Sequence, residues 1–307
     1  MPRFGMYRRT VYLSNMTQSI LLLSLFIVSV FCSHHRLTAA TEQELRDTWF
    51  DGAEITTYSL KQVRYGDEHP GVATLIFVTE PFDTTKQVKS DRRDSNDMDV
   101  LKLNALREFN TGIYAYRTMT SVFSPLFEED GRALKLTTSV QDWCGQVYAQ
   151  INREDGALRY ELRSYFEGEG DQDLEWTGDI WMENGFWTLL RRDPQALPVG
   201  EFLAIPDSLS LRFSHRETRP YAAVGEMKSG RIWSSYRVEY PELGRFLEIE
   251  FATAFPHGIR GWTERDTATS QVTEAELMKR ISNSYYWSQN SPKDRNLREK
   301  LNLSGIP

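Results

Sequence analysis

The sequence predicts a mainly β protein, with one large antiparallel sheet curved into a sandwich or partly open barrel and a few short helices. Short segments rich in β-branched and aromatic residues recur along the chain, and turn residues separate them, such as Glu-Asp-Gly at 129–131 and 154–156. Regularly spaced strands with turn signals are typical of all-β folds. No repeat or low-complexity linker interrupts residues 41–307, which favours a single domain.

The first forty residues have the pattern of an export signal. Residues 20–31 carry no charge, and Arg3, Arg8 and Arg9 precede them without any acidic residue. An apolar run of about 7–15 residues behind a basic segment is typical of a secretory signal peptide, whereas a membrane-spanning helix needs roughly 20 apolar residues. We therefore expect an exported protein of the periplasm or cell surface.

Two cleavage sites suit this signal. Small residues at Thr38 and Ala40 favour cleavage after Ala40, which makes 1–40 the signal peptide and 41–307 the mature domain. Cys32 would instead become a lipidated N-terminus, although Phe31 stands where such a site prefers a small residue. Cleavage after Ala40 fits the residues better, and an uncleaved anchor is the third alternative.

Charge and cysteine content limit the partners of the mature chain. Residues 1–40 contain four arginines and no carboxylate, so their removal changes the net charge from −7 to −11. Nucleic-acid binding needs a basic surface, and we expect no nucleic-acid partner. Membrane contact is expected only through the signal or a lipid on Cys32. The mature chain keeps Cys144 alone, which excludes an internal disulfide.

A helix and a strand are expected first in the domain. Residues 41–50 begin with Thr41 as a candidate N-cap and Glu44 three residues later, a pattern that starts helices. From Ala53 onward the side chains alternate with the period of two that is typical of a strand, up to turn residues at 65–67.

The next segment, residues 72–79, is almost wholly apolar and predicts a buried central strand that ends at Pro81. Ten further segments have the composition of strands. They are residues 100–106, 111–123, 133–140, 146–151, 158–166, 209–213, 221–227, 232–238, 246–251 and 259–263.

Three segments depart from this pattern. Residues 178–192 predict a helix that covers one mouth of the sheet. Residues 291–303 begin with Ser291 as a cap and Pro292 at the first helical position, which predicts a short terminal helix. The charged residues 86–99 predict a mobile loop.

Trp143 and Cys144 are the first candidates for a chemical site, because a cysteine with a histidine elsewhere can act as a nucleophile. A reactive thiolate needs a cationic or dipolar setting. His69, His215 and His257 lie at no family spacing from the cysteine. We therefore expect Cys144 to be a buried structural thiol in a strand.

Acidic residues alternate through the segment 167–175, and Glu167 and Asp171 are site candidates among them. Carboxylate oxygens in such a loop are calcium ligands, but an EF-hand loop would have a glycine after Asp173, where the chain has Leu174. The segment is therefore expected to be an acidic turn between strands.

His257, which follows Phe255 and Pro256, is the last site candidate. With His215 it would supply two zinc ligands, and one further histidine in the mature chain is too few to indicate a zinc site. We expect neither a metal nor a cofactor. The HExxH, GxSxG, P-loop and dinucleotide-binding motifs are absent from the sequence, which argues against the commonest enzyme classes.

Several stretches carry a family resemblance. They are 52–55 with 65–66, LIFVTE at 75–80, KQVK at 86–89, VLKLN at 100–104, FNTGIY at 109–114, WCG at 143–145, YFE at 165–167 with 169–171, and FPH at 255–257 with 261–262. In these stretches the chain resembles a family of uncharacterised exported proteins and lipoproteins of Bacteroidota-type bacteria, commonly mislabelled "septum formation inhibitor Maf".

The resemblance implies export and no particular activity or ligand. Members of the family usually carry a lipid-accepting cysteine after the apolar run, where this chain has Cys32. True Maf proteins are cytoplasmic nucleotide pyrophosphatases with an α/β fold and a Ser-x-Ser-Pro-Arg-Arg start. This chain lacks that start, so we do not expect a Maf-type pyrophosphatase.

Two functions are compatible with the sequence. The favoured one is a non-catalytic cell-envelope protein whose curved sheet binds a ligand or a protein partner, since eight Trp and fourteen Tyr can line an apolar cavity. The alternative is a hydrolase of unfamiliar type that uses the acidic residues at 167–171, or Cys144 with His215 or His257.

Overall fold

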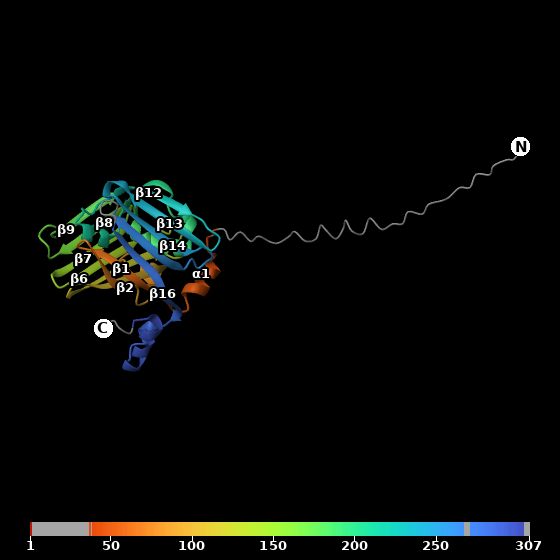
Figure 1. The fold of residues 1–307 in the computed structure, drawn as a ribbon, viewed down its shortest axis with the longest axis horizontal. Helices are drawn as coiled ribbons and strands as arrows, with labels where there is room; N and C mark the ends of the chain where they lie inside the picture. The colour runs from red at the N-terminus through yellow and green to blue at the C-terminus, as the bar shows by residue number, and fades with distance from the viewer. Residues whose placement is uncertain (2–36, 38, 267–270, 304–307) are drawn as a thin grey trace. The chain divides into compact units, whose positions relative to one another are not determined.

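The structure is a computed structural model that describes residues 1, 37, 39–266 and 271–303. The chain divides into two compact units, residues 1–34 and 35–307, and the fold described below belongs to the second (Figure 1). The expected signal segment, with Cys32, lies outside the described residues. No helix in the described part is long and apolar enough to cross a membrane.

Short helices accompany a large set of strands. The helices are α1 (Glu42–Trp49), α2 (Phe186–Arg192) and α3 (Ser208–Ser214), and the 3₁₀ helices are η1 (Glu183–Gly185), η2 (Pro194–Ala196), η3 (Pro241–Leu243), η4 (Tyr286–Ser288) and η5 (Pro292–Leu301). The strands are β1 (Ala53–Arg64), β2 (Asp67–Asp83), β3 (Val88–Lys89), β4 (Asp97–Thr111), β5 (Tyr114–Pro125), β6 (Lys135–Asp142), β7 (Gly145–Glu154), β8 (Ala157–Ser164), β9 (Gln172–Thr177), β10 (Ile180–Met182), β11 (Gly200–Ile205), β12 (Tyr221–Lys228), β13 (Trp233–Tyr240), β14 (Arg245–Ala252), β15 (Ile259–Asp266) and β16 (Val272–Ser284).

Within the described residues, sixteen strands form one sheet that curves into a nearly closed barrel (Figure 1). Its order is β10-β11-β12-β13-β14-β15-β16-β1-β2-β4-β5-β6-β7-β8-β9, with β3 paired to β2. The edge strands β9 and β10 are neighbours in the sequence, separated by Gly178 and Asp179. The predicted fold class is confirmed, with one addition: β10 and β11 are parallel, so the sheet is mixed.

The segment η1–α2 lies in the lumen of the barrel, and all its residues are buried. Its side chains reach strands on opposite sides. Thr188 Oγ1 is 2.6 Å from Ser124 Oγ of β5, whereas the Trp187 ring packs edge-on against Trp262 of β15, with 5.1 Å between ring centroids. A short helix that is surrounded by side chains in this way forms part of the core. The predicted helix within 178–192 is confirmed, but it fills the lumen as well as closing one mouth.

The barrel has two different ends, which we name after their helices. At the α2 end, Arg192 of α2 donates to the carbonyl of Pro125, the last residue of β5, at 3.1 Å. At the α3 end, Arg64, the last residue of β1, donates to the carbonyl of Phe213 in α3 at 2.7 Å. Because successive hairpins of an antiparallel sheet turn at alternate edges, the β1–β2, β4–β5, β6–β7 and β8–β9 turns share the α3 end, and the β14–β15 turn lies at the α2 end.

Residues before α1 pack onto the domain. Leu37 is buried in the main core cluster, and its carbonyl accepts a hydrogen bond from the Gln195 side chain. The Ala40 N–H donates to the Arg192 carbonyl at 3.3 Å. The predicted leading helix is confirmed, including the capping box between Thr41 and Glu44.

A buried ion pair joins α2 to the sheet. The Arg191 guanidinium donates to both oxygens of Glu54 in β1, at 2.6 and 2.9 Å. It also lies over the rings of Trp49 and Phe77, 4.7 and 4.6 Å from their centroids. Burial raises the pKa of Glu54, but the guanidiniums of Arg191 and Arg280 outweigh this and lower it. The carboxylate therefore stays charged inside the core.

One predicted strand is wrong. Residues 209–213 form helix α3, because the Asp207 side chain caps its first turn by accepting from the Ser210 N–H at 3.0 Å. His215 then takes a left-handed conformation, with φ of 51°, and ends the helix. Both signals are local and outweigh the alternation of Leu209 and Leu211.

The prediction that Pro81 ends the second strand is also wrong. β2 continues to Asp83, and β1 pairs with β2 only as far as Phe77. The Pro81 carbonyl accepts a hydrogen bond from the Ser90 N–H at 2.9 Å, on the side of β2 that faces away from β4. The Pro81 nitrogen faces the same side, so the pairing of β2 with β4 needs no N–H donor from Pro81.

Other differences have similar local causes. β9, β10, β11 and β16 were not predicted, and β10 occupies the start of the segment 178–192 that was expected to be helical. In β16 only Thr273, Ala275 and Ser284 are buried, so its apolar alternation is weak. The loop 86–99 contains β3 and is held by Gln87, whose side chain donates to a carbonyl of β7 at 2.8 Å. The predicted terminal helix is confirmed as the 3₁₀ helix η5.

Replacement of Arg191 tests the pair that holds α2. Arg191→Met removes the bidentate partner of the buried Glu54 and leaves only the longer contact with Arg280, at 3.6 Å. We expect it to lower the free energy of unfolding by about 3 kcal/mol, measured by urea denaturation. Adding Glu54→Gln should recover part of the loss. Arg46→Met, which removes an exposed pair with Glu42, should change little. Equal losses for Arg191→Met and Arg46→Met would contradict this account.

Candidate functional site

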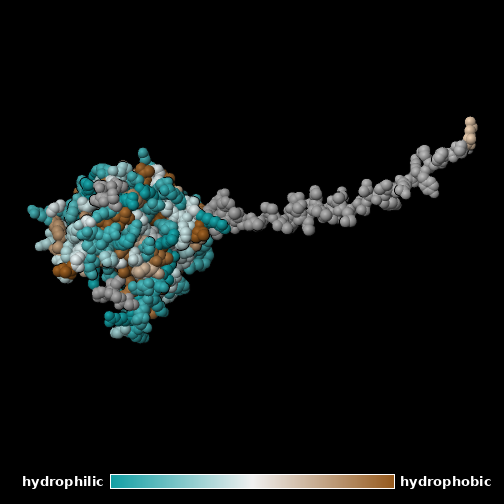
Figure 2. Space-filling model, in the orientation of Figure 1, coloured by the Kyte–Doolittle hydropathy of each residue, from teal (hydrophilic) through white to brown (hydrophobic). Residues whose placement is uncertain are grey.

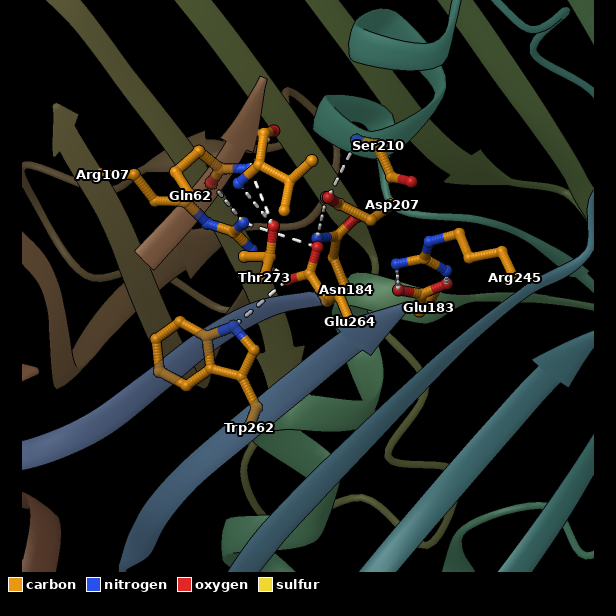
Figure 3. A network of polar contacts seen from close by, with 11 residues as sticks. Gln62, Arg107, Glu183, Asn184, Asp207, Ser210, Arg245, Trp262, Glu264 and Thr273 are labelled. Atoms are coloured by element: carbon orange, nitrogen blue, oxygen red, sulfur yellow. Dashed lines mark hydrogen bonds and ion pairs between the residues drawn. The ribbon is translucent and has the colours of Figure 1, made fainter. Parts of the chain in front are cut away.

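Helix α3 stands between the sheet and solvent at its end of the barrel, and a buried network fixes its start. Asp207 caps the helix and also accepts from the Asn184 side chain of η1 at 2.7 Å. The neighbouring Glu183 binds Arg245 of β14 through two hydrogen bonds of 2.6 and 2.8 Å (Figure 3). The position of α3 therefore depends on the lumenal segment.

The network continues across the lumen to β4 and β15. Arg107 forms an ion pair with Glu264, and Glu264 also accepts from the Trp262 indole at 3.1 Å. Gln62 of β1 accepts from Arg107 at 3.1 Å and donates to the Thr273 hydroxyl at 3.2 Å (Figure 3). Glu183 and Glu264 each pair with an arginine, and Asp207 is held by hydrogen bonds from Asn184 and the Ser210 N–H. A stable buried network requires such partners.

The two carboxylates of this network differ in their pKa values. Burial raises the pKa of Glu183, and Arg245 offsets this in part. Burial acts on Glu264 in the same direction, but Arg107 and then Arg245 outweigh it, so the pKa of Glu264 is lowered. Both carboxylates are held by guanidinium groups, so the geometry gives them structural roles.

A cavity of about 620 Å³ lies on one side of α3. Inward-facing side chains of three consecutive strands form its apolar wall: Val140 of β6, Val147 and Ala149 of β7, and Tyr160 and Leu162 of β8. They alternate with outward-facing residues along each strand, as the pleat requires. Each of these five side chains is buried, with at most 7% of its surface exposed.

Polar groups gather where this cavity meets α3. Arg212 of α3 forms an ion pair with Glu169 at 2.7 Å and lies over the Phe166 ring, 4.3 Å from its centroid. His215 Nδ1 is 3.8 Å from the same carboxylate. The buried Arg212 Nε has no hydrogen-bond partner among the described residues. The cavity thus combines an apolar wall with a polar, partly unsatisfied mouth.

Trp143 and Cys144 lie away from this cavity wall. They form the β6–β7 turn at the α3 end, where Trp143 is 70% exposed and Cys144 is a free, exposed cysteine. The expectation of a buried thiol in a strand is therefore wrong. The cause is local, because Asp142 accepts from the Cys144 N–H at 2.6 Å and closes a tight turn.

His257 lies at the opposite end, in the β14–β15 turn. It is buried, its Nδ1 is 3.2 Å from the Ala252 carbonyl, and its ring packs against Phe251 and Phe255. The fold thus separates Cys144 from His257 by the length of the barrel. In the described ranges no three His, Cys, Asp or Glu side chains group as a metal site would require.

The acidic candidates do not converge either. Glu167 and Asp171 are exposed in the β8–β9 loop, and Asp171 accepts from the Ser164 N–H at 3.3 Å. The neighbouring Glu169 is the one that turns toward α3. Sequence reasoning missed Arg212, because residues 209–213 were expected in a strand, and the cap at Asp207 was the signal that could have placed it.

Apolar side chains are exposed around the same end. Tyr65, Ile113, Trp143 and Tyr165 each stand at the tip of a turn there and are 60–88% exposed. Figure 2 shows that the visible face is otherwise largely hydrophilic, with separate apolar patches. Single exposed apolar residues are common, but four successive tips with this character distinguish the α3 end.

Comparisons with known proteins show what the chain is similar to. No model of a known protein family matches the sequence, and no curated protein does. Among solved structures, the chain is similar to a beta-barrel-like protein of the domain of unknown function DUF1849 from Brucella abortus. Sequence identity is 10%, the TM-score is 0.47, and the match covers 75% of this chain and 98% of that chain. The function is therefore inferred from the side chains of this domain.

The lowered pKa of Glu264 predicts how stability depends on pH. Its pKa in the unfolded chain is near the ordinary value of 4.5, so its stabilising effect is complete above that pH and is lost as the pH falls through the lower, folded value. Glu264→Gln should reduce stability at pH 7 and flatten the loss of stability below pH 4.5. Urea denaturation across this range measures both effects.

Glu274→Gln is the matched control, because this carboxylate on the adjacent strand is 43% exposed and pairs with Lys61 at the surface. It should leave the pH dependence almost unchanged. Parallel stability curves for wild type and Glu264→Gln would show that the ion pair with Arg107 does not couple folding to pH.

Proposed function

We propose that this protein is a non-catalytic binding module that holds an amphiphilic small molecule in the cavity between α3 and strands β6–β8. The observation that carries the proposal is the division of that cavity into an apolar wall and a polar mouth. Its volume of about 620 Å³ lies within the roughly 300–1,000 Å³ that is usual for small-molecule sites.

The wall suits the hydrocarbon part of such a ligand. Val140, Val147, Ala149 and Leu162 present only carbon atoms from their side chains, and they are already buried from bulk water. Each methylene that enters such an environment contributes about 0.8 kcal/mol. An acyl chain or an alicyclic body would therefore gain affinity along the wall without requiring hydrogen bonds there.

The mouth suits a polar head group with little net charge. The Arg212 guanidinium is balanced by Glu169, so the site offers a hydrogen-bond donor and an acceptor side by side. The unpartnered Arg212 Nε and the Thr218 hydroxyl, 3.2 Å from Tyr160, are further polar groups near it. A zwitterionic or uncharged polar head meets this arrangement better than a strongly anionic one.

The hydrolase alternative has no comparable support. Cys144 with His257 would require two residues from opposite ends of the barrel to meet. Glu167 and Asp171 face solvent, and Glu169 is neutralised by Arg212. A general acid or base must lie within hydrogen-bond reach of its partner. His215 lies at the same end as Cys144, but among the described residues its side-chain contacts are with Arg212 and Glu169, and it has no hydrogen bond with Cys144.

We place the module in the cell envelope, because its N-terminal sequence has the pattern of an export signal and its sequence resembles exported proteins. The packing of Leu37 bears on the site of processing. Cleavage after Ala40 would remove Leu37 from the core cluster and leave Gln195 without its acceptor. The structure therefore favours cleavage upstream of Leu37, and Cys32 is the candidate new N-terminus.

Binding of a fluorescent amphiphile tests the proposed function. N-phenyl-1-naphthylamine should brighten when it enters the apolar cavity, and lysophosphatidylcholine should displace it. Ala149→Trp, which fills the space between β7 and α3, should weaken binding about tenfold or more. Gln146→Trp adds the same ring to an exposed position on the same strand and should leave binding unchanged.

Thermal unfolding of both variants guards against loss of the fold, and Ala149→Met offers a smaller obstruction if Ala149→Trp does not fold. Equal affinity of the wild type and a folded Ala149→Trp or Ala149→Met would place the probe elsewhere and would refute the proposed site.

The intact mass of the exported protein tests the processing. Cleavage before Cys32 predicts a mature chain that begins at Cys32 and carries the mass of attached acyl groups. A chain that begins at Thr41, with the same thermal stability as one that keeps Leu37, would contradict the role given to Leu37.

A further inference from the structure

A second cavity, of about 200 Å³, lies on the other side of α3, between this helix and strands β1, β4, β14 and β15. Its lining is rich in cationic side chains, and Glu264 is the one carboxylate among the described side chains that line it. The arginines are Arg64, Arg107, Arg216, Arg245 and Arg265. This is unusual in a chain whose net charge is −7.

Only part of this positive charge is balanced within the protein. Arg107 pairs with Glu264, and Arg245 pairs with Glu183. Among the side chains that the structure describes, Arg64 has no carboxylate within ion-pair distance, and neither has Arg216. The cavity therefore carries an excess of positive charge where α3 meets the end of β1.

Arg64 is the most informative of these residues, because it is only 8% exposed. Its guanidinium donates to the Phe213 carbonyl at 2.7 Å and lies over the rings of Tyr65 and Phe213, 4.2 and 4.7 Å from their centroids. Its buried Nε has no hydrogen-bond partner in the described part of the chain. A buried cation without a counter-charge is costly unless something else neutralises it.

From this geometry we infer that the small cavity is an anion site that takes one oxyanion group, a phosphate or a carboxylate, with Arg64 as its main cation. Arginine is suited to such groups because its planar guanidinium can bind two of their oxygens. Arg216 is exposed at the rim of the cavity and adds charge there. The volume is below the usual range for drug-sized ligands, so the group bound is small.

This site is distinct from the amphiphile cavity of the proposed function. The two cavities lie on opposite sides of α3, and of the described residues that line them only Arg216 is common to both. The apolar wall of β6–β8 belongs to the larger cavity alone. Either site can therefore be shown or refuted without the other.

Titration of the full-length protein with inorganic phosphate, and separately with succinate, tests the inference. Isothermal titration calorimetry at constant ionic strength, adjusted with sodium chloride, separates specific binding from general screening. We expect saturable binding of at least one of the two anions, and the anion that binds identifies the oxyanion. Absence of binding by both would overturn the inference.

Variants locate the anion. Arg64→Met should weaken binding about tenfold or more, since it removes a charge-assisted hydrogen bond, and Arg64→Lys should retain part of the affinity. Arg117→Met is the matched control, because its side chain is 60% exposed on β5, and it should bind as the wild type does. If Arg64→Met does not fold, Arg216→Gln at the exposed rim should still weaken binding. If Arg64→Met folds and binds the anion with unchanged affinity, the assignment is refuted. If Arg64→Met does not fold, unchanged affinity of Arg216→Gln refutes it.

Discussion

The lumenal segment from Glu183 to Arg192 is the part on which the rest of the barrel depends. Buried ion pairs hold it at both ends, Glu183 with Arg245 of β14 and Arg191 with Glu54 of β1. Pairs of this kind contribute little net stability compared with apolar packing, but each fixes one arrangement, because a displaced partner would leave a buried charge alone. The segment is therefore held in one position relative to the sheet.

This placement decides where the barrel keeps open space. The α2 end is filled by α2 itself, by α1 and by the rings packed around Arg191. At the other end η1 holds Asp207, Asp207 caps α3, and α3 lies between two cavities of different chemistry. One is apolar with a balanced polar mouth, and the other is lined by five arginines, of which Arg64 and Arg216 have no carboxylate partner among the described residues. A single short helix thus separates the proposed hydrocarbon site from the proposed anion site.

Much of the fold could be predicted from the sequence, because the period of two in the hairpin strands and the turn residues between them are local signals. The cap at Thr41 and the helix within 178–192 were predicted for the same reason. α3 was missed because Leu209 and Leu211 alternate like strand residues, and only the Asp207 cap distinguishes them. β16 was missed because few of its side chains are buried.

The candidate site was harder to predict from the sequence, because its residues come together only in the folded structure. Cys144, His257 and Glu167 were site candidates because of their residue types. In the fold, Cys144 and Glu167 are exposed to solvent, and His257 lies at the opposite end of the barrel. Arg212, Glu169 and the wall of β6–β8 come from distant parts of the chain, and no spacing in the sequence connects them. Arg64, which has no carboxylate partner in the described part of the chain, is likewise an ordinary strand-end residue until α3 covers it.

The most direct test of the central claim is an NMR measurement of where an amphiphile lies. With a lysophosphatidylcholine that carries a doxyl spin label on its acyl chain, we expect selective broadening of the methyl signals of Val140, Val147 and Leu162. Methyl signals of Val78 and Ile281, in the separate cluster on the outer face, should stay sharp. Broadening confined to Ile113 and other exposed tips, or spread evenly over the surface, would contradict the assignment of the cavity beside α3 as the binding site.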